Sequence, residues 1–284
     1  YFRPPVQVDT LIYDGDGTPR QIRTVYNYDS YGNITEEKQY GDLSSTRDDR
    51  TILRTFYHNT DKWIISLPAE EDVYQGITTK TRVSNTKFYY DDLTGCDATP
   101  TNNQMPVKGN LTRTVRLNNV GTPSNIENRT AYDDHGNPVC TRDPNGNITY
   151  TTYDSSKIFP VAVTNPLGQS TVTQYYGVDG IIADNGLYGQ IKSVTDPNGA
   201  LTGTEYDGYG RKARETKPDG AWTTWSYHEF GTVGSQRVRT EKSTGEWTQE
   251  YFDGLGRTFR TESSGPDGKT IIKKSVYGNR GNIV

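Results

Sequence analysis

The sequence predicts an all-β protein built from short antiparallel strands, and three observations support this prediction. Hydrophobic residues make up only 31% of the 284 residues, yet 21 residues are tyrosine and aromatic residues reach 11%. The net charge is only −4, and disordered chains combine low hydrophobicity with high net charge and few aromatic residues. Glycine and proline recur at regular intervals between segments rich in tyrosine, threonine and valine, which favour strands over a helix bundle.

The same composition argues against two classes of protein. The 31 basic and 35 acidic residues leave no net positive field to attract phosphates, so we expect no nucleic-acid partner. No run of residues approaches the roughly 18 apolar residues that a membrane span requires. We therefore expect no membrane span.

Two turn signatures recur along the chain. The first places an aromatic residue four positions before a glycine, as in Tyr28 to Gly32, Tyr132 to Gly136, Tyr206 to Gly210 and Phe252 to Gly256. The second is Pro-x-Gly, found at Pro144 and Gly146, Pro166 and Gly168, Pro197 and Gly199, Pro218 and Gly220, and Pro266 and Gly268. The period is near 21 residues, the spacing of Tyr132 and Tyr153. A fixed period of this size indicates a repeat architecture.

Each half-period predicts one turn and one short strand, so one period predicts a two-stranded hairpin. Asp-x-x-Gly and Asp-Pro-Asn-Gly supply the positive φ angles that tight hairpin turns require. A lone hairpin is unstable, so the hairpins must lie side by side in a meander. We predict roughly 20 or more strands whose accumulated twist coils the sheet. The tyrosine rings, one per turn, are expected to stack along this wall and cap the hairpin ends.

The regularity of the repeat predicts two regions. Residues 1–107 form an irregular β region with degenerate repeats, and residues 108–284 carry regular repeats that stop within a repeat, at Tyr277 to Gly281. The chain also begins without methionine or a signal peptide, so we expect it to be part of a longer protein. Cys96 and Cys140 lie 44 residues apart without metal-ligand spacing, and both a disulfide and a reduced pair are compatible with the sequence.

The units from Tyr132 to Tyr153 and from Thr195 to Gly210 resemble RHS/YD repeats. Such repeats occur in bacterial Rhs polymorphic toxins, in the BC component of insecticidal ABC toxin complexes and, more distantly, in animal teneurins. The resemblance implies a spiralling antiparallel sheet that forms a segment of a hollow shell. It also implies a secreted or cell-surface bacterial protein whose shell encloses a C-terminal toxin or other cargo. The aspartate-rich closing motif that ends such toxin shells is not visible in this sequence.

The acidic residues of the repeat are candidates for paired acid/base chemistry, but their recurrence argues otherwise. Asp29, Asp133, Asp207 and Asp253 occupy one turn position each, which indicates backbone capping rather than a unique pair of carboxylates. Two segments, Asp14 to Asp16 and Asp143 to Asn147, superficially resemble calcium loops but lack the glutamate that such a loop requires. We interpret both as turns.

We predict no catalytic, cofactor or metal site. His58, His135 and His228 are far apart in the sequence, and no nucleophile elbow, P-loop or zinc signature is present. The predicted function is therefore that of an encapsulating wall, whose partners are the remainder of its shell and the enclosed cargo.

The alternative is an extracellular structural or adhesive protein that forms a filament, a surface layer or a carbohydrate-binding face. Open sheet edges can associate with one another, which would support a filament. Trp222 and Trp225 are candidates for sugar contacts, although at positions i and i+3 they share a face only if the strand is bulged.

Overall fold

The computed structural model describes residues 4–13, 15, 17–101, 104–117, 125–278 and 281–283. Asp14 and Asp16, which carry the first calcium-like segment, lie outside the described residues. The chain divides into two compact units, Tyr1–Tyr150 and Thr151–Val284, and each is described by itself. The predicted division after residue 107 rests on repeat regularity and stays a prediction.

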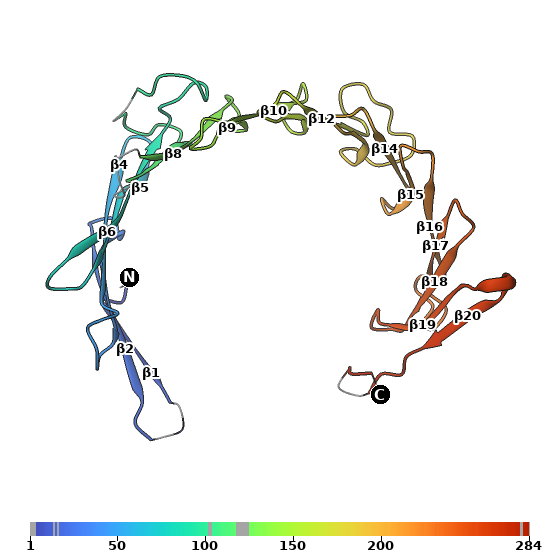
Figure 1. Ribbon diagram of the computed structural model, residues 1–284, viewed down its shortest axis with the longest axis horizontal. Coiled ribbons are helices and arrows are strands. Elements are labelled where there is room, and N and C mark those ends of the chain that lie inside the picture. Colours follow the sequence, from blue (N-terminus) through green and yellow to red (C-terminus); the bar gives the residue numbers. More distant parts are fainter. Residues whose placement is uncertain are drawn as a thin grey trace. The chain divides into compact units, whose positions relative to one another are not determined.

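The described elements are strands apart from one short 3-10 helix, η1 (Pro266–Gly268), which confirms the predicted all-β fold (Figure 1). The first unit contains β1 (Gln7–Ile12), β2 (Arg20–Tyr28), β3 (Ile34–Asp42), β4 (Arg50–Asn59), β5 (Ile64–Gln75), β6 (Thr81–Tyr90), β7 (Leu111–Arg116), β8 (Ile126–Tyr132), β9 (Pro138–Arg142) and the start of β10 (Ile148–Tyr153).

The second unit begins with the end of β10. It continues with β11 (Pro160–Thr164), β12 (Ser170–Tyr175), β13 (Ile191–Thr195), β14 (Leu201–Tyr206), β15 (Lys212–Thr216), β16 (Trp222–His228), β17 (Arg237–Lys242), β18 (Trp247–Phe252), β19 (Thr258–Ser264) and β20 (Thr270–Lys274). No helix among the described residues is long and apolar enough to cross a membrane.

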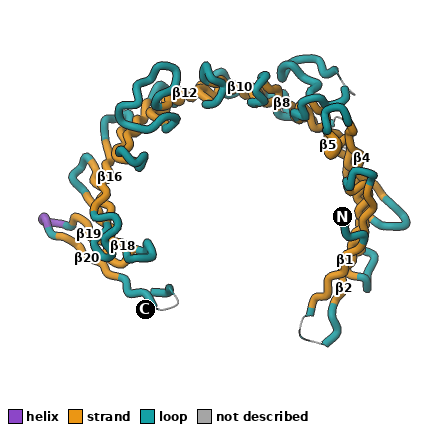
Figure 2. Tube along the Cα trace, turned by 180° about the vertical axis from the view of Figure 1, so that it is seen from behind, coloured by secondary structure: helices purple, strands orange, loops and turns teal. Residues whose placement is uncertain are grey.

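Within each unit, every strand pairs antiparallel with the next one along the chain. This holds from β1 to β10 in the first unit. It holds from β11 to β20 in the second. Each unit is thus the predicted meander, drawn as a single layer of strands with turns along both edges (Figure 2).

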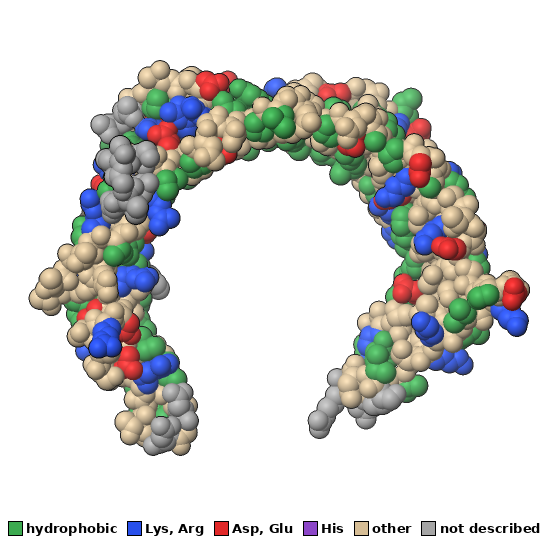
Figure 3. Space-filling model, in the orientation of Figure 1, with side chains coloured by type: hydrophobic (Ala, Val, Ile, Leu, Met, Phe, Trp, Pro, Cys, Tyr) green, Lys and Arg blue, Asp and Glu red, His purple; other side chains and the backbone are tan. Residues whose placement is uncertain are grey.

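A single-layer sheet explains the polar composition, because few side chains can be buried completely. The buried cluster of the first unit consists of Cys96, Ala131 and Cys140, with Val139 and Ile148 packed against it. Elsewhere most strand residues are only half-buried, and apolar and charged side chains alternate over the surface (Figure 3). Tyrosine and threonine suit such half-wet faces because each has an apolar body and a polar end.

Candidate functional site

The repeated turn is the feature from which the surface of each unit is built, and the turn after β8 shows its geometry. The backbone N–H of Asp133 donates to the carbonyl of Asn137 (2.9 Å), and that of Gly136 donates to the carbonyl of Asp133 (3.1 Å). The Asp133 carboxylate accepts from the N–H groups of His135 (2.9 Å) and Asn137 (3.0 Å). Gly136 has a φ of +85°, which favours glycine because it has no Cβ.

Both sequence signatures form this same turn. The side chain that accepts from the N–H groups two and four positions ahead belongs to Asp29, Asp207 and Asp253 in Tyr-Asp turns, and to Asp143, Asn165 and Asp196 in Pro-x-Gly turns. The recurrent carboxylates therefore cap the backbone. In Asp133, burial raises the pKa, but hydrogen bonds from Asn137 and His135 outweigh it and lower the pKa overall.

Two turns of the Pro-x-Gly series depart from the sequence pattern. The turn Lys242–Glu246 has the same backbone bond, from Gly245 N–H to the Lys242 carbonyl (2.9 Å), without any proline to reveal it in the sequence. At Pro266 to Gly268, proline lies one place earlier in the turn, because Lys269 N–H donates to the Pro266 carbonyl and Asp267 adopts a φ of +56°. Glycine position is thus the more faithful marker of this turn.

The aromatic residue distinguishes Tyr-Asp turns from Pro-x-Gly turns. The strand register shifts by one residue at Tyr28, Tyr132, Tyr206 and Phe252, each at the end of its strand. The hairpins closed by the Pro-x-Gly turns of β9–β10, β11–β12, β13–β14 and β15–β16 show no such shift. A bulge re-aims a side chain, so the aromatic ring leaves the regular alternation of the strand.

Tyrosine hydroxyls then connect neighbouring hairpins. Tyr132 donates to the carbonyl of Leu111 (3.1 Å), Tyr227 to that of Lys212 (2.9 Å) and Tyr277 to that of Thr258 (2.7 Å). Each acceptor lies two residues after the glycine of the preceding Tyr-Asp turn. The arginine between glycine and acceptor lies over the same ring, at 4.1 Å for Arg211 on Tyr227 and 4.5 Å for Arg257 on Tyr277.

One Tyr-Asp turn is greatly enlarged. Asp91 and Asn110 form the same stem as Asp133 and Asn137, since Asp91 N–H donates to the Asn110 carbonyl (2.9 Å) and Gly109 has a φ of +84°. Between Asp91 and Gly109 lie 17 residues, where the compact turn has two. The sequence did not predict this equivalence, because the insertion separates the tyrosine from its glycine.

The inserted loop is fixed by its own side chains. The Asp91 carboxylate accepts from four backbone N–H groups, those of Val107, Lys108, Gly109 and Asn110, at 2.8 to 3.0 Å. Burial raises the pKa of Asp91, but these four hydrogen bonds outweigh it and lower the pKa overall.

Two further contacts attach the loop to the sheet face. The Arg113 guanidinium donates to buried Asp92 (2.9 Å). Cys96 and Cys140 form a disulfide with a Cα–Cα distance of 6.1 Å, which decides between the two states that the sequence left open. The loop is therefore a fixed part of the wall.

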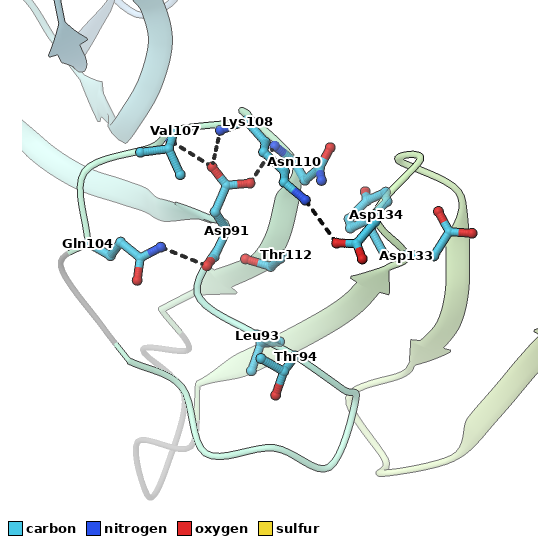
Figure 4. Close-up of a pocket in the computed structure, with 11 residues that line it drawn as sticks. Asp91, Leu93, Thr94, Gln104, Val107, Lys108, Asn110, Thr112, Asp133 and Asp134 are labelled. Atoms are coloured by element: carbon cyan, nitrogen blue, oxygen red, sulfur yellow. Dashed lines mark hydrogen bonds and ion pairs between the residues drawn. The ribbon is translucent and has the colours of Figure 1, made fainter. Parts of the chain in front are cut away.

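The loop and the next turn enclose a cavity of about 450 Å³ in the first unit (Figure 4). Leu93, Thr94 and Thr112 line it, together with the carboxylates of Asp91 and Asp133. Both carboxylates accept turn N–H groups, so they serve the backbone rather than forming a free acid/base pair. At the rim, Lys108 pairs with Asp134 (3.3 Å) between two well-exposed side chains.

The three histidines lie in separate places. His58 contacts Asp29 (3.1 Å), His228 lies 3.1 Å from the Ser226 hydroxyl, and His135 lies in the exposed turn after β8. Within the described ranges, no group of three or more His, Cys, Asp or Glu side chains could hold a metal ion.

The two tryptophans of β16 do not form one platform. The pairings of β16 with β15 and β17 contain no register shift, so Trp222 and Trp225 lie on opposite faces. Each lies near a cation instead, Trp222 near Arg214 (5.3 Å) and Trp225 near Lys212 (5.2 Å).

Comparisons with known proteins agree with this geometry. The sequence model of the RHS Repeat family matches residues 188–221, a stretch that includes Gly189, Pro197, Tyr206, Gly210 and Pro218. No curated protein matches the sequence.

Among solved structures, the crystal structure of TcdB2-TccC3 matches 98% of this chain at 12% identity with a TM-score of 0.61. TcdB2-TccC3 without its hypervariable C-terminal region (98% covered, 12% identity) has a TM-score of 0.27. The Photorhabdus luminescens Tc holotoxin pore with a TccC3 mutation (98% covered, 12% identity) has a TM-score of 0.18.

This chain spans about a fifth of each of those solved chains, namely 20 to 22% of their lengths. Only the first comparison has a TM-score that supports a common fold, and it covers nearly all of this chain. Together with the matched repeat and the shared turn geometry, it shows that the chain is an RHS/YD-repeat protein with the fold seen in TcdB2-TccC3.

Proposed function

We propose that this chain forms part of the wall of an RHS-type shell that encloses a C-terminal cargo segment of the same polypeptide. The observation that carries the proposal is the fold match to TcdB2-TccC3 over 98% of this chain, which corresponds to 21% of the matched chain. A wall requires an extended single-layer sheet, and both units have this architecture. The partners are the remainder of the shell and the cargo.

The faces of the sheet support a containing role. In the second unit a row of side chains crosses five strands, from Gln174 through Ser193, Gly203 and Thr216 to Trp222. The row is polar apart from its tryptophan and carries no charge. A face of this kind offers an unfolded cargo chain neither a large apolar patch nor a strong field, so it can hold the chain without trapping it.

The disulfide supports a secreted or surface-delivered protein. Cys96 and Cys140 are paired and buried, at 2% and 4% exposure. Disulfides persist in oxidising compartments and are rare in reducing ones. We assign no catalytic role to the chain, because the recurrent carboxylates are occupied as turn caps.

Limited proteolysis of the full-length protein that carries this chain tests the proposal. The C-terminal segment is expected to be digested at least tenfold more slowly inside the full-length protein than as a separate polypeptide. A second, sequence-unrelated segment fused at the same place serves as the matched control, because a shell protects by enclosure rather than by recognition. Equal digestion of enclosed and free segments would overturn the proposal.

The filament or adhesive alternative predicts different behaviour in sedimentation. A shell stays at one size when the protein concentration is raised, whereas filament subunits grow. Growth without protection of the C-terminal segment would favour the structural alternative.

A further inference from the structure

The two edges of the second unit have different chemistry. Because consecutive strands are antiparallel, successive turns alternate between the edges. One edge, called here the Tyr-Asp edge, contains the turns at 154–159, 176–190, 207–211, 229–236 and 253–257. The opposite Pro-Gly edge contains the turns at 165–169, 196–200, 217–221, 242–246 and 265–269.

Exposed large apolar side chains are concentrated on the Tyr-Asp edge, where they include Ile182, Leu187, Tyr209, Phe230, Val233 and Leu255. Tyr209 is 84% exposed and Leu255 is 78% exposed. Among the described residues of the Pro-Gly turns, only Leu167 is a large exposed apolar residue. Contiguous exposed apolar surface marks an interaction site, so the two edges differ in their capacity for contact.

The apolar side chains stand on turns that are tied to one another. The Gln190 amide donates to the carbonyl of Gly210 (2.8 Å), and the Gln236 amide donates to that of Asp253 (2.7 Å). Between these two links, the Arg211 guanidinium lies 5.1 Å from the Tyr209 ring and 5.5 Å from the Phe230 ring. The edge is therefore a pre-organised strip rather than a set of independent loops.

The charges of the strip are neutralised within it. Arg211 pairs with Asp207, and Arg257 pairs with Asp253, each at 2.7 Å. A second sheet edge can therefore approach without like-charge repulsion. The aromatic residues also follow the hairpin period, since 21 residues separate Tyr188 from Tyr209 and Tyr209 from Phe230.

We propose that the Tyr-Asp edge packs along a further stretch of YD-repeat sheet from the same polypeptide, outside residues 1–284. This inference rests on the proposed shell. The chain spans 21% of the matched TcdB2-TccC3 chain, so a shell of that size supplies further sheet. Another YD sheet presents one turn per hairpin at the same spacing, so each apolar residue of the strip meets one turn. The polar Pro-Gly edge of this stretch lacks such a strip and remains open to solvent.

Cysteine labelling of the full-length protein tests this packing. Leu255→Cys and Val233→Cys place a thiol on the Tyr-Asp edge, and the matched control Thr244→Cys places one on the Pro-Gly edge. The native cysteines form a disulfide and do not react with maleimide. We expect the Tyr-Asp edge thiols to react at least tenfold more slowly than the control thiol, at every protein concentration.

In the isolated 1–284 chain, all three thiols are expected to react at similar rates, since nothing covers the strip. Equal rates at the two edges of the full-length protein would overturn the inference. Protection that disappears on dilution would also overturn it, because the partner would then be a second copy. Cargo digestion is measured separately, so open edges with protected cargo would contradict the packing alone.

Discussion

The Tyr-Asp turns at 91–110 and 207–211 have one stem but two ways of being stabilised. In the compact turn, the Asp207 carboxylate accepts the N–H groups of Tyr209 and Arg211 and pairs with the Arg211 side chain. In the enlarged turn, Asp91 accepts four N–H groups, and the loop beyond it is attached by a buried ion pair and a disulfide. The comparison teaches that the stem defines the repeat, while the loop that it carries is free to vary.

Removal of the disulfide is expected to give the largest difference between the two turns. Cys96→Ser combined with Cys140→Ser opens a closed loop with a sequence separation of 44 residues, and should lower the free energy of unfolding of the first unit by about 4 kcal/mol. Urea denaturation measures this loss. Reductant should destabilise the native protein similarly and leave the double variant unchanged. A loss below about 1 kcal/mol would show that the side-chain network holds the loop without the disulfide.

Replacing aspartate by asparagine should separate the two turns next. Asn165 already caps one turn, so Asp207→Asn retains the two N–H contacts and is expected to have a small effect. Asp91→Asn removes the Oδ2 acceptor of three N–H groups and should cost about 2 kcal/mol. Equal effects in denaturation experiments would contradict the different roles of these carboxylates.

The same pair of variants tests the pH dependence. The pKa of Asp91 is lowered in the folded state, so its contribution to stability is present above the unfolded pKa of about 3.9 and is lost as pH falls through the folded value. Stability of the native protein should therefore decrease more steeply below about pH 4 than that of Asp91→Asn. Parallel pH profiles for the two proteins would argue against this role of Asp91.

Glycine substitution should affect both turns to the same extent, because the stem is shared. Gly109 and Gly210 have φ angles of +84° and +78°, so Gly109→Ala and Gly210→Ala should each cost about 1–2 kcal/mol. Gly203→Ala is the matched control, since this mid-strand glycine has open space where the methyl group would lie. Thermal denaturation should show the control to be unchanged or slightly stabilised.

The sequence predicted the parts of the fold that depend on local turn chemistry. Periodic glycine, proline and aspartate positions predicted the hairpins, the antiparallel pairing and the capping role of residues such as Asp133, because each of these follows from a few neighbouring residues. The prediction that the tyrosines act at the hairpin ends also agrees with the hydroxyl contacts of Tyr132 and Tyr227.

The parts that depend on distant contacts could not be predicted. The spacing of Cys96 and Cys140 is compatible with either redox state, and only the folding of the loop onto β9 brings the two residues together. The stem formed by Asp91 and Gly109 was hidden because 17 residues separate its halves. The apolar Tyr-Asp edge was likewise invisible, because it arises from turns that alternate along the chain but align in space.

Exchange of the enlarged turn for the compact one tests the shared stem most directly. Residues 92–108 are replaced by the dipeptide Asp-His of the turn after β8, and Cys140→Ala removes the unpaired thiol. Hydrogen exchange is then measured at the β6–β7 pairing, where Phe88 lies opposite Thr114 and Tyr90 opposite Leu111. The account predicts a folded, less stable protein in which these amides stay protected in the same register. Loss of protection at β6 and β7, with β4 and β5 still folded, would contradict it.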